Sequence, residues 1–176
     1  MAFCGGHKEI AVGIDRPIVI GTMLGEVEKD RLITTAGARP GDDILLSKAM
    51  RHGRIHSMHD PTEGGLANAL HEIAAAANVG LVVEEDRVPI LEECKVLCNH
   101  YGLDPLGLIA SGSLLIMVES SDSGKVIRSL GKAGIPAAKI GEIAHKEQGV
   151  KIRCEQRLKD VPMFARDEIA RILEKA

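Results

Sequence analysis

The seven residues from His59 to Gly65 combine the chemical groups that a phosphate-handling site needs. They read His-Asp-Pro-Thr-Glu-Gly-Gly. An imidazole and two carboxylates can move protons, and carboxylate oxygens are also ligands that Mg²⁺ prefers. Two successive glycines that open a helix present bare backbone amides, which suit an approaching anion. We therefore predict catalytic roles for His59, Asp60 and Glu63, with Asp60 as the candidate Mg²⁺ ligand.

The same turn also has a purely structural interpretation. Asp60 can cap a helix whose first residue is Pro61, and Glu63 can complete a capping box. Each glycine in the first turn of that helix costs about 1 kcal/mol relative to Ala. The glycines therefore need a reason, which is either a ligand close to the backbone or tight packing on a neighbouring segment. The residues alone leave both explanations open.

A strand and a helix must position this turn. Residues 55–58 are expected to form a strand, and 62–78 a helix, because apolar residues recur there at spacings of three and four. The other expected elements are strands at 17–26, 31–35, 44–46, 80–84 and 113–119, helices at 90–101, 123–132 and 164–175, and a closing hairpin of 137–143 and 150–154. Strands and helices intermix without a strict βαβ repeat, which favours an α/β (α+β) domain with a mixed sheet. We expect a leader at 1–16 and one domain at 17–176.

Composition excludes several classes of protein. The 176 residues are 45% hydrophobic and 27% charged, with a formal net charge of -3, as in an ordinary globular domain. No stretch concentrates Lys and Arg and aromatic residues are scarce, so a nucleic-acid partner is not expected. No apolar run reaches the length of a membrane span, and no signal peptide is evident. We expect a cytoplasmic protein with reduced thiols and no membrane partner.

Two other groups of residues invite a metal-site hypothesis. Cys94 and Cys98 lie four positions apart on an expected helix, close to His100. Helical cysteines are more often buried than metal-bound, so we expect structural thiols rather than a zinc site. For His52 and His56 we expect exposed positions in a basic loop.

The turn and several other segments resemble a known family. Met58 to Ala67 reads MHDPTEGGLA and precedes an Ala-rich helix; the other segments, in order, are CGGHKE at 4–9, GEVEKD at 25–30, RPGD at 39–42, GLDPL at 102–106 and SGSLL at 111–115. The set resembles the carboxyl-terminal half of the aminoimidazole-ribonucleotide synthetase-related superfamily, closest to archaeal-type synthetase-related proteins and the hydrogenase expression/formation protein E family. This resemblance implies a three-layer, partly ferredoxin-like fold. It also implies an enzyme that uses ATP to phosphorylate an amide-like or related acceptor.

The resemblance implies further site residues and partners. Its cofactors are ATP and Mg²⁺, and its ligand is a small phosphate-bearing molecule. The domain would work as a homodimer or with a separate nucleotide-binding domain. The implied nucleotide-binding residues are Gly5, Gly6 and His7, and the implied substrate- or phosphate-binding residues are Thr62, Gly64, Gly65, Ser111 and Gly112.

Four departures from the family pattern narrow the expectation. The nucleotide-binding half is missing, and only Ser47 to Met58 links two strands that a longer helical segment usually connects. Lys8 stands where Thr is common, and no cysteine lies at the carboxyl terminus to carry a thiocarboxamide group. We therefore expect the incomplete carboxyl-terminal half of an ATP-dependent enzyme. The alternatives are a non-catalytic ligand- or protein-binding module that self-associates, and a fragment or internally deleted form of a longer protein.

Overall fold

The computed structural model describes residues 25–47 and 54–173. Contacts divide the chain into two units, Met1–Leu32 and Ile33–Ala176. The described part of the first unit contains a single 3-10 turn, η1 (Lys29–Arg31).

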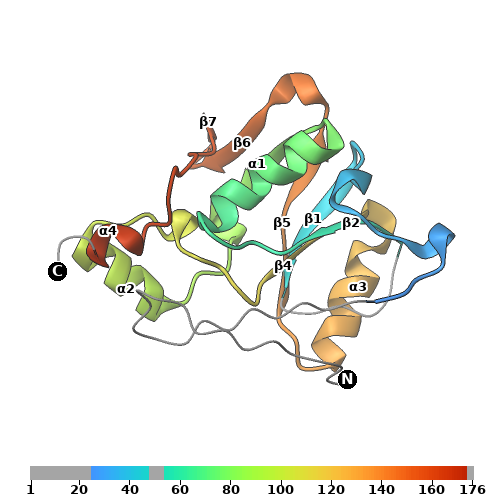
Figure 1. Ribbon diagram of the computed structural model, residues 1–176, viewed down its shortest axis with the longest axis horizontal. Helices are drawn as coiled ribbons and strands as arrows, with labels where there is room; N and C mark the ends of the chain where they lie inside the picture. The colour runs from blue at the N-terminus through green and yellow to red at the C-terminus, as the bar shows by residue number, and fades with distance from the viewer. Residues whose placement is uncertain (1–24, 48–53, 174–176) are drawn as a thin grey trace, which may run out of the picture. The chain divides into compact units, whose positions relative to one another are not determined.

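A seven-stranded mixed sheet forms the centre of the second unit (Figure 1). Its strands are β1 (Asp42–Ser47), β2 (Ile55–His59), β3 (Gly80–Glu84), β4 (Leu114–Glu119), β5 (Ala137–Ala144), β6 (Val150–Cys154) and β7 (Arg157–Asp160). They lie in the order β2-β4-β1-β5-β3-β6-β7. Only β3 and β6 pair in parallel, and the other neighbours are antiparallel. β2, which leads into the predicted site, is therefore an edge strand of the described sheet.

The described residues of this unit also form four helices and four 3-10 turns. The helices are α1 (Gly65–Ala77), α2 (Glu92–Tyr101), α3 (Ser120–Lys132) and α4 (Ala170–Leu173). The turns are η2 (Thr35–Gly37), η3 (Glu85–Arg87), η4 (Pro105–Gly107) and η5 (Lys146–Gln148). As predicted, Gly102 ends α2: it adopts a left-handed conformation with a φ of 64°.

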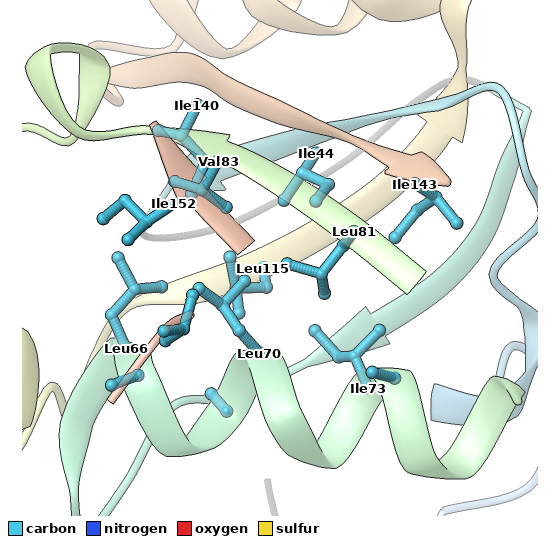
Figure 2. Packing of buried hydrophobic residues seen from close by; sticks show 14 of the residues in the cluster. Ile44, Leu66, Leu70, Ile73, Leu81, Val83, Leu115, Ile140, Ile143 and Ile152 are labelled. Atoms are coloured by element: carbon cyan, nitrogen blue, oxygen red, sulfur yellow. The ribbon is translucent and has the colours of Figure 1, made fainter. Parts of the chain in front are cut away.

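α1 and α3 cover opposite faces of the sheet. Neighbouring residues of a strand point to opposite faces, so one strand can contribute to the core beneath each helix. Ile44 of β1 belongs to the core beneath α1, whereas Leu45 belongs to the core beneath α3. Figure 2 shows the first core, in which Leu66, Leu70 and Ile73 of α1 face Ile44, Leu81, Val83, Leu115, Ile140, Ile143 and Ile152. The second core joins Val126 and Leu130 of α3 to Leu45, Ile116 and Val118. The predicted three-layer α/β fold with a mixed sheet is confirmed.

The predicted closing hairpin is wrong, although both of its strands exist. β3 lies between β5 and β6, pairing antiparallel with β5 and parallel with β6. The connection between β5 and β6 crosses the start of β3, where a Cβ on Gly80 would lie 2.3 Å from the carbonyl oxygen of His145. Because Gly80 has no side chain, the connection can pass this close. β6 instead forms its hairpin with β7, a strand that the sequence analysis missed.

Two further predicted elements differ in the structure. Residues 31–35 were expected to be a strand, but 3-10 turns lie at Lys29–Arg31 and Thr35–Gly37, and η2 packs along the outer edge of β2. The terminal helix expected at 164–175 does not begin until α4 at Ala170, because residues 164–168 use their backbone groups to bind other segments. The predicted leader lies outside the described residues, as does most of the strand predicted at 17–26. Within the described ranges, no helix combines the length and the apolar character needed to cross a membrane.

Candidate functional site

The predicted capping box at the turn is wrong. α1 begins at Gly65, and its N-cap is Gly64, with a φ of 73°. No side chain within the described helix start caps it in the way predicted for Asp60 and Glu63. The preceding residues instead form a tight turn, in which the Gly65 amide donates to the carbonyl of Thr62 at 3.1 Å. Asp60 and Glu63 are therefore free of the capping role.

The backbone amide of Gly64 is hydrogen-bonded to a carboxylate from the far end of the chain. This buried N–H donates to Oδ2 of Asp167 at 3.0 Å. The other oxygen of Asp167 accepts the amide of Ile169 at 3.0 Å, so both carboxylate oxygens are engaged. An anion does sit at the start of α1, as the electrostatics of a helix N-terminus favours. It is supplied by the protein itself.

Tight packing explains why position 65 is a glycine. Its φ is 63°, a left-handed conformation that other residues seldom adopt. A Cβ at this position would lie 2.3 Å from the carbonyl oxygen of Leu108 and 2.6 Å from that of Leu106. Both the conformation and the approach of the η4 loop require the missing side chain. The structural explanation that the sequence left open therefore accounts for Gly65.

Polar residues of α1 hold the carboxyl-terminal segment against the helix. The Asn68 amide group donates to the carbonyl of Phe164 at 2.9 Å and accepts the Phe164 amide at 3.0 Å. One turn later, Nε2 of His71 donates to the carbonyl of Val161 at 3.0 Å. These contacts and the Asp167 bond fix residues 161–168 to the first two turns of α1. We call residues 161–171 the strap.

Glu168 fastens the strap to the η4 loop. Its buried side chain accepts the amide of Asp104 at 2.9 Å, and its own amide donates to the carbonyl of Gly107 at 3.1 Å. The guanidinium of Arg171 lies 2.6 Å from the carboxylate. Hydrogen bonds from Arg171 and the Asp104 amide lower the pKa of Glu168, against the opposing effect of burial. The carboxylate is therefore ionised and structural at neutral pH.

His59 lies at the end of β2 and pairs with a glutamate of α1. Its Nε2 lies 2.6 Å from Oε2 of Glu72, and its Nδ1 lies 3.5 Å from the hydroxyl of Thr35. An ionised carboxylate only accepts hydrogen bonds, so the pairing places a proton on Nε2. The His59 side chain is 18% exposed and that of Glu72 is 54% exposed. Of the two side chains, Glu72 is therefore the one that is more open to solvent.

Three polar residues of the turn point into solvent. Asp60, Thr62 and Glu63 are exposed. The amide of Ala110 donates to the carbonyl of Thr62 at 3.4 Å. This bond brings the exposed Ser111–Gly112 loop beside the turn, so the structure gathers five of the predicted residues on one surface.

Other predicted residues lie elsewhere or outside the described ranges. The prediction that His56 is an exposed loop residue is wrong: it lies in β2, and its Nδ1 is 2.8 Å from the buried carboxylate of Asp42. Gly5, Gly6, His7 and His52 fall outside the described residues. Over residues 25–47 and 54–173, no three His, Cys, Asp or Glu side chains gather closely enough to hold a metal ion.

The sequence analysis missed the residues that complete this site. Asn68, His71 and Glu72 lie off the apolar stripe of the helix, on a face where polar residues are usually solvent-exposed, so the sequence alone suggests no role for them. Asp167 went unnoticed, although an Asp just before a short helix is a recognised capping signal. Nothing in the sequence indicates that its carboxylate reaches a turn 103 residues earlier.

Comparison with known proteins identifies the family of the chain that carries this site. Residues 39–153 match the family described as AIR synthase related protein, C-terminal domain. This match covers more than half of the chain. The chain belongs to this family. The matched part of the AIR synthase-related domain includes the turn, α1 and the Ser111–Gly112 loop, whereas the strap lies beyond it.

Relatives from hydrogenase maturation match most of this domain. A protein of Methanocaldococcus jannaschii, named for hydrogenase expression and formation, is 27% identical over 203 residues, covering 93% of this chain and 61% of its own length. The carbamoyl dehydratase HypE of Cupriavidus necator is 30% identical over 167 residues, covering 73% of this chain and 48% of its own length. The chain thus spans about half to three fifths of these relatives. The first match is longer than this chain of 176 residues, so that relative carries extra residues inside the matched region.

Solved structures agree with the family assignment. HypE in complex with ATP superposes with a TM-score of 0.71 at 26% identity, over 81% of this chain and 56% of that structure. The HypE of E. coli gives a TM-score of 0.73 over 84% of this chain and 57% of that structure, and its 22% identity supports the fold alone.

Proposed function

We propose that this AIR synthase-related domain is the acceptor-side half of an ATP-using enzyme of the hydrogenase-maturation type. The observation that carries the proposal is the surface formed by Asp60, Thr62, Glu63 and the Ser111–Gly112 loop beside the His59–Glu72 pair. Its family relatives include carbamoyl dehydratases, and one similar structure was solved with ATP. The reaction would be phosphoryl transfer from ATP to an amide-like or related acceptor oxygen.

The exposed residues have distinct roles in this proposal. Asp60 and Glu63 contact the acceptor or a phosphate-bound cation, while the Thr62 hydroxyl and the Ser111–Gly112 loop orient the ligand. The His59–Glu72 pair takes up or supplies the proton that the acceptor exchanges. The Gly65 amide is held by Thr62 and the Gly64 amide by Asp167. A phosphate could therefore reach the Gly64 amide only by displacing Asp167.

Asp60 is the proposed ligand of Mg²⁺. Within the described ranges, no group of three or more His, Cys, Asp or Glu residues could form a metal site. Mg²⁺ commonly binds through one or two carboxylates together with substrate phosphates, and it keeps several waters. Asp60, which is exposed, fits that mode of binding and would supply one ligand. The cation would neutralise negative charge on the phosphates.

A second part must complete the site. Positioning of phosphates, metal and acceptor together accounts for most of the catalysis in phosphoryl transfer. The chain spans only 48–61% of the two relatives described above, and Gly5, Gly6 and His7 lie outside the described residues. We propose that a nucleotide-binding domain, in the same polypeptide or a partner, faces the turn. The domain would work in the cytoplasm, within a homodimer or with that partner.

ADP formation tests this function. The chain is mixed with Mg²⁺-ATP, with and without the purified nucleotide-binding half of a family member, and ADP is measured over time. We expect turnover only in the complete mixture, and Asp60→Ala should abolish most of it. Equal rates for Asp60→Ala and the wild type would show that the turn is not catalytic.

One observation favours a second function, a non-catalytic module that self-associates. Leu91, Val96, Leu97 and Tyr101 of the α2 region are each more than half exposed. Several large apolar residues on one exposed segment are typical of a protein interface. Sedimentation at high concentration distinguishes the two functions: a monomer contradicts self-association, and a dimer that forms no ADP in the complete mixture supports it.

A further inference from the structure

Two thiols of α2 face each other. Sγ of Cys94 lies 3.9 Å from Sγ of Cys98. Residues four positions apart share one face of a helix, so the regular geometry of α2 holds the two sulfurs together. Cys98 is buried and Cys94 is partly exposed, which leaves one of the sulfurs accessible from solvent.

The sulfur separation suits binding to one metal ion. Two sulfurs held at about 2.3 Å on opposite sides of a two-coordinate cation lie about 4.6 Å apart. The 3.9 Å of the empty pair is shorter than this separation, and rotation of the two side chains can widen it. Two ligands at this spacing on one helix are also the arrangement that zinc-binding histidines use.

The same helix geometry disfavours a disulfide. Helical residues four apart have Cβ atoms about 5–6 Å apart, whereas a disulfide needs about 3.5–4.5 Å. Oxidation would therefore distort α2, but a metal ion bridges the longer distance. The pair is better suited to chelation than to redox switching.

The charges around the pair favour a cation. Burial, which has the largest effect, acts together with the Cys94 thiol and the carboxylates of Asp104 and Glu168 to raise the pKa of Cys98 to about 11. The Cys98 thiol is thus protonated at neutral pH. The same negative carboxylates attract a bound cation. Binding releases the thiol protons to water.

The number of ligands selects the class of cation. Zn²⁺ in structural sites takes four ligands, and the part of the chain that the structure describes brings together no group of three or more His, Cys, Asp or Glu residues. Soft sulfur donors select Cu⁺, and monovalent d¹⁰ cations accept two ligands. We propose that Cys94 and Cys98 form a two-sulfur chelating site for a monovalent thiophilic cation of the Cu⁺ class. On binding, two S–H protons leave and two sulfur–metal bonds form, with no change of oxidation state.

Silver titration tests the site, because Ag⁺ is a redox-inert member of this class. The parent protein carries Cys4→Ser and Cys154→Ser, which removes the other two cysteines of the chain. Tyr101, the only tyrosine in a chain without tryptophan, lies on the same helix and reports binding through its fluorescence. In excess glutathione, we expect the parent to retain one equivalent of Ag⁺. Cys94→Ser should weaken binding at least tenfold, because a chelate holds its second ligand at high effective concentration.

Matched variants make the outcome decisive. Cys94 is only partly buried, so Cys94→Ser should keep the circular dichroism spectrum of the parent, and Cys98→Ser serves as the second variant. A protein that restores Cys154 but carries Cys94→Ser measures what unpaired thiols contribute. Binding by Cys94→Ser as tight as by the parent overturns the proposal, as does a parent that loses its Ag⁺ to glutathione. Zn²⁺ binding as tight as Ag⁺ binding overturns the proposed class of cation.

Discussion

The buried amide of Gly64 donates a 3.0 Å hydrogen bond to the carboxylate of Asp167, a residue 103 positions further along the chain. This bond places a protein carboxylate where the sequence analysis expected a phosphate. It also ties the strap to the start of α1, next to the exposed turn.

Loss of the Asp167 carboxylate should destabilise the fold. Asp167→Ala leaves the Gly64 and Ile169 amides without their acceptor, and we expect a loss of about 2–3 kcal/mol in the free energy of unfolding. Asp167→Asn retains an acceptor oxygen and should cost less. Urea unfolding measures both values. The exposed Asp160 of β7, which pairs with Lys151 of β6, provides the control, and Asp160→Ala should cost no more than about 0.5 kcal/mol.

Substitutions at Gly65 and Gly102 distinguish the stability cost of close packing from that of a strained backbone conformation. Their φ values are 63° and 64°, but a Cβ meets two carbonyl oxygens at Gly65 and open space at Gly102. Gly102→Ala should cost about 1 kcal/mol for the left-handed conformation alone. Gly65→Ala adds a steric clash and should cost about 3 kcal/mol. Equal losses in thermal or urea unfolding would contradict the packing explanation for Gly65.

Asn68 should control the docking of the strap. Asn68→Ala removes both hydrogen bonds to Phe164, and we expect it to cost about 2 kcal/mol. Hydrogen exchange at the Phe164 amide should accelerate, because this N–H loses its acceptor. Asn99, an exposed asparagine of α2, gives the control, and Asn99→Ala should leave that exchange rate unchanged. Unchanged protection of Phe164 in Asn68→Ala would contradict the role of Asn68.

The buried Asp43 should make the stability of the fold depend on pH in the acid range. Burial raises its pKa, but hydrogen bonds from Lys139, Ser123 and Ser120 outweigh that effect and lower the pKa below 3.8. A carboxyl whose pKa is lower in the folded state stabilises the protein above its unfolded pKa, and this contribution is lost as the pH falls through the folded pKa. Asp43→Asn should therefore be less stable than the wild type at pH 7, and the difference should shrink below pH 3.8. A difference that stays constant from pH 7 to pH 2.5 would contradict this assignment.

The sequence predicts local structure well wherever periodicity and turn residues agree. The strand Gly80–Glu84 and the end of α2 at Gly102 follow the prediction, because apolar runs and a terminal glycine act within a few residues. The insertion of β3 between β5 and β6 depends on pairing between distant segments, which short-range patterns do not encode. The Gly64–Asp167 and His59–Glu72 contacts also join separate segments, so short-range patterns do not predict them either. The sequence therefore identified the turn, but not the residues that hold it in place.

The central claim is that the exposed turn forms one wall of an ATP-dependent site, and ADP formation by Asp60→Ala tests it most directly. In the complete mixture with Mg²⁺-ATP and the nucleotide-binding half, we predict that Asp60→Ala lowers the rate at least 100-fold, about 2.7 kcal/mol in transition-state free energy. Asp86→Ala, at an exposed carboxylate of η3, should keep the wild-type rate. Equal rates for Asp60→Ala and wild type, or no ADP from the wild-type mixture, would contradict the account.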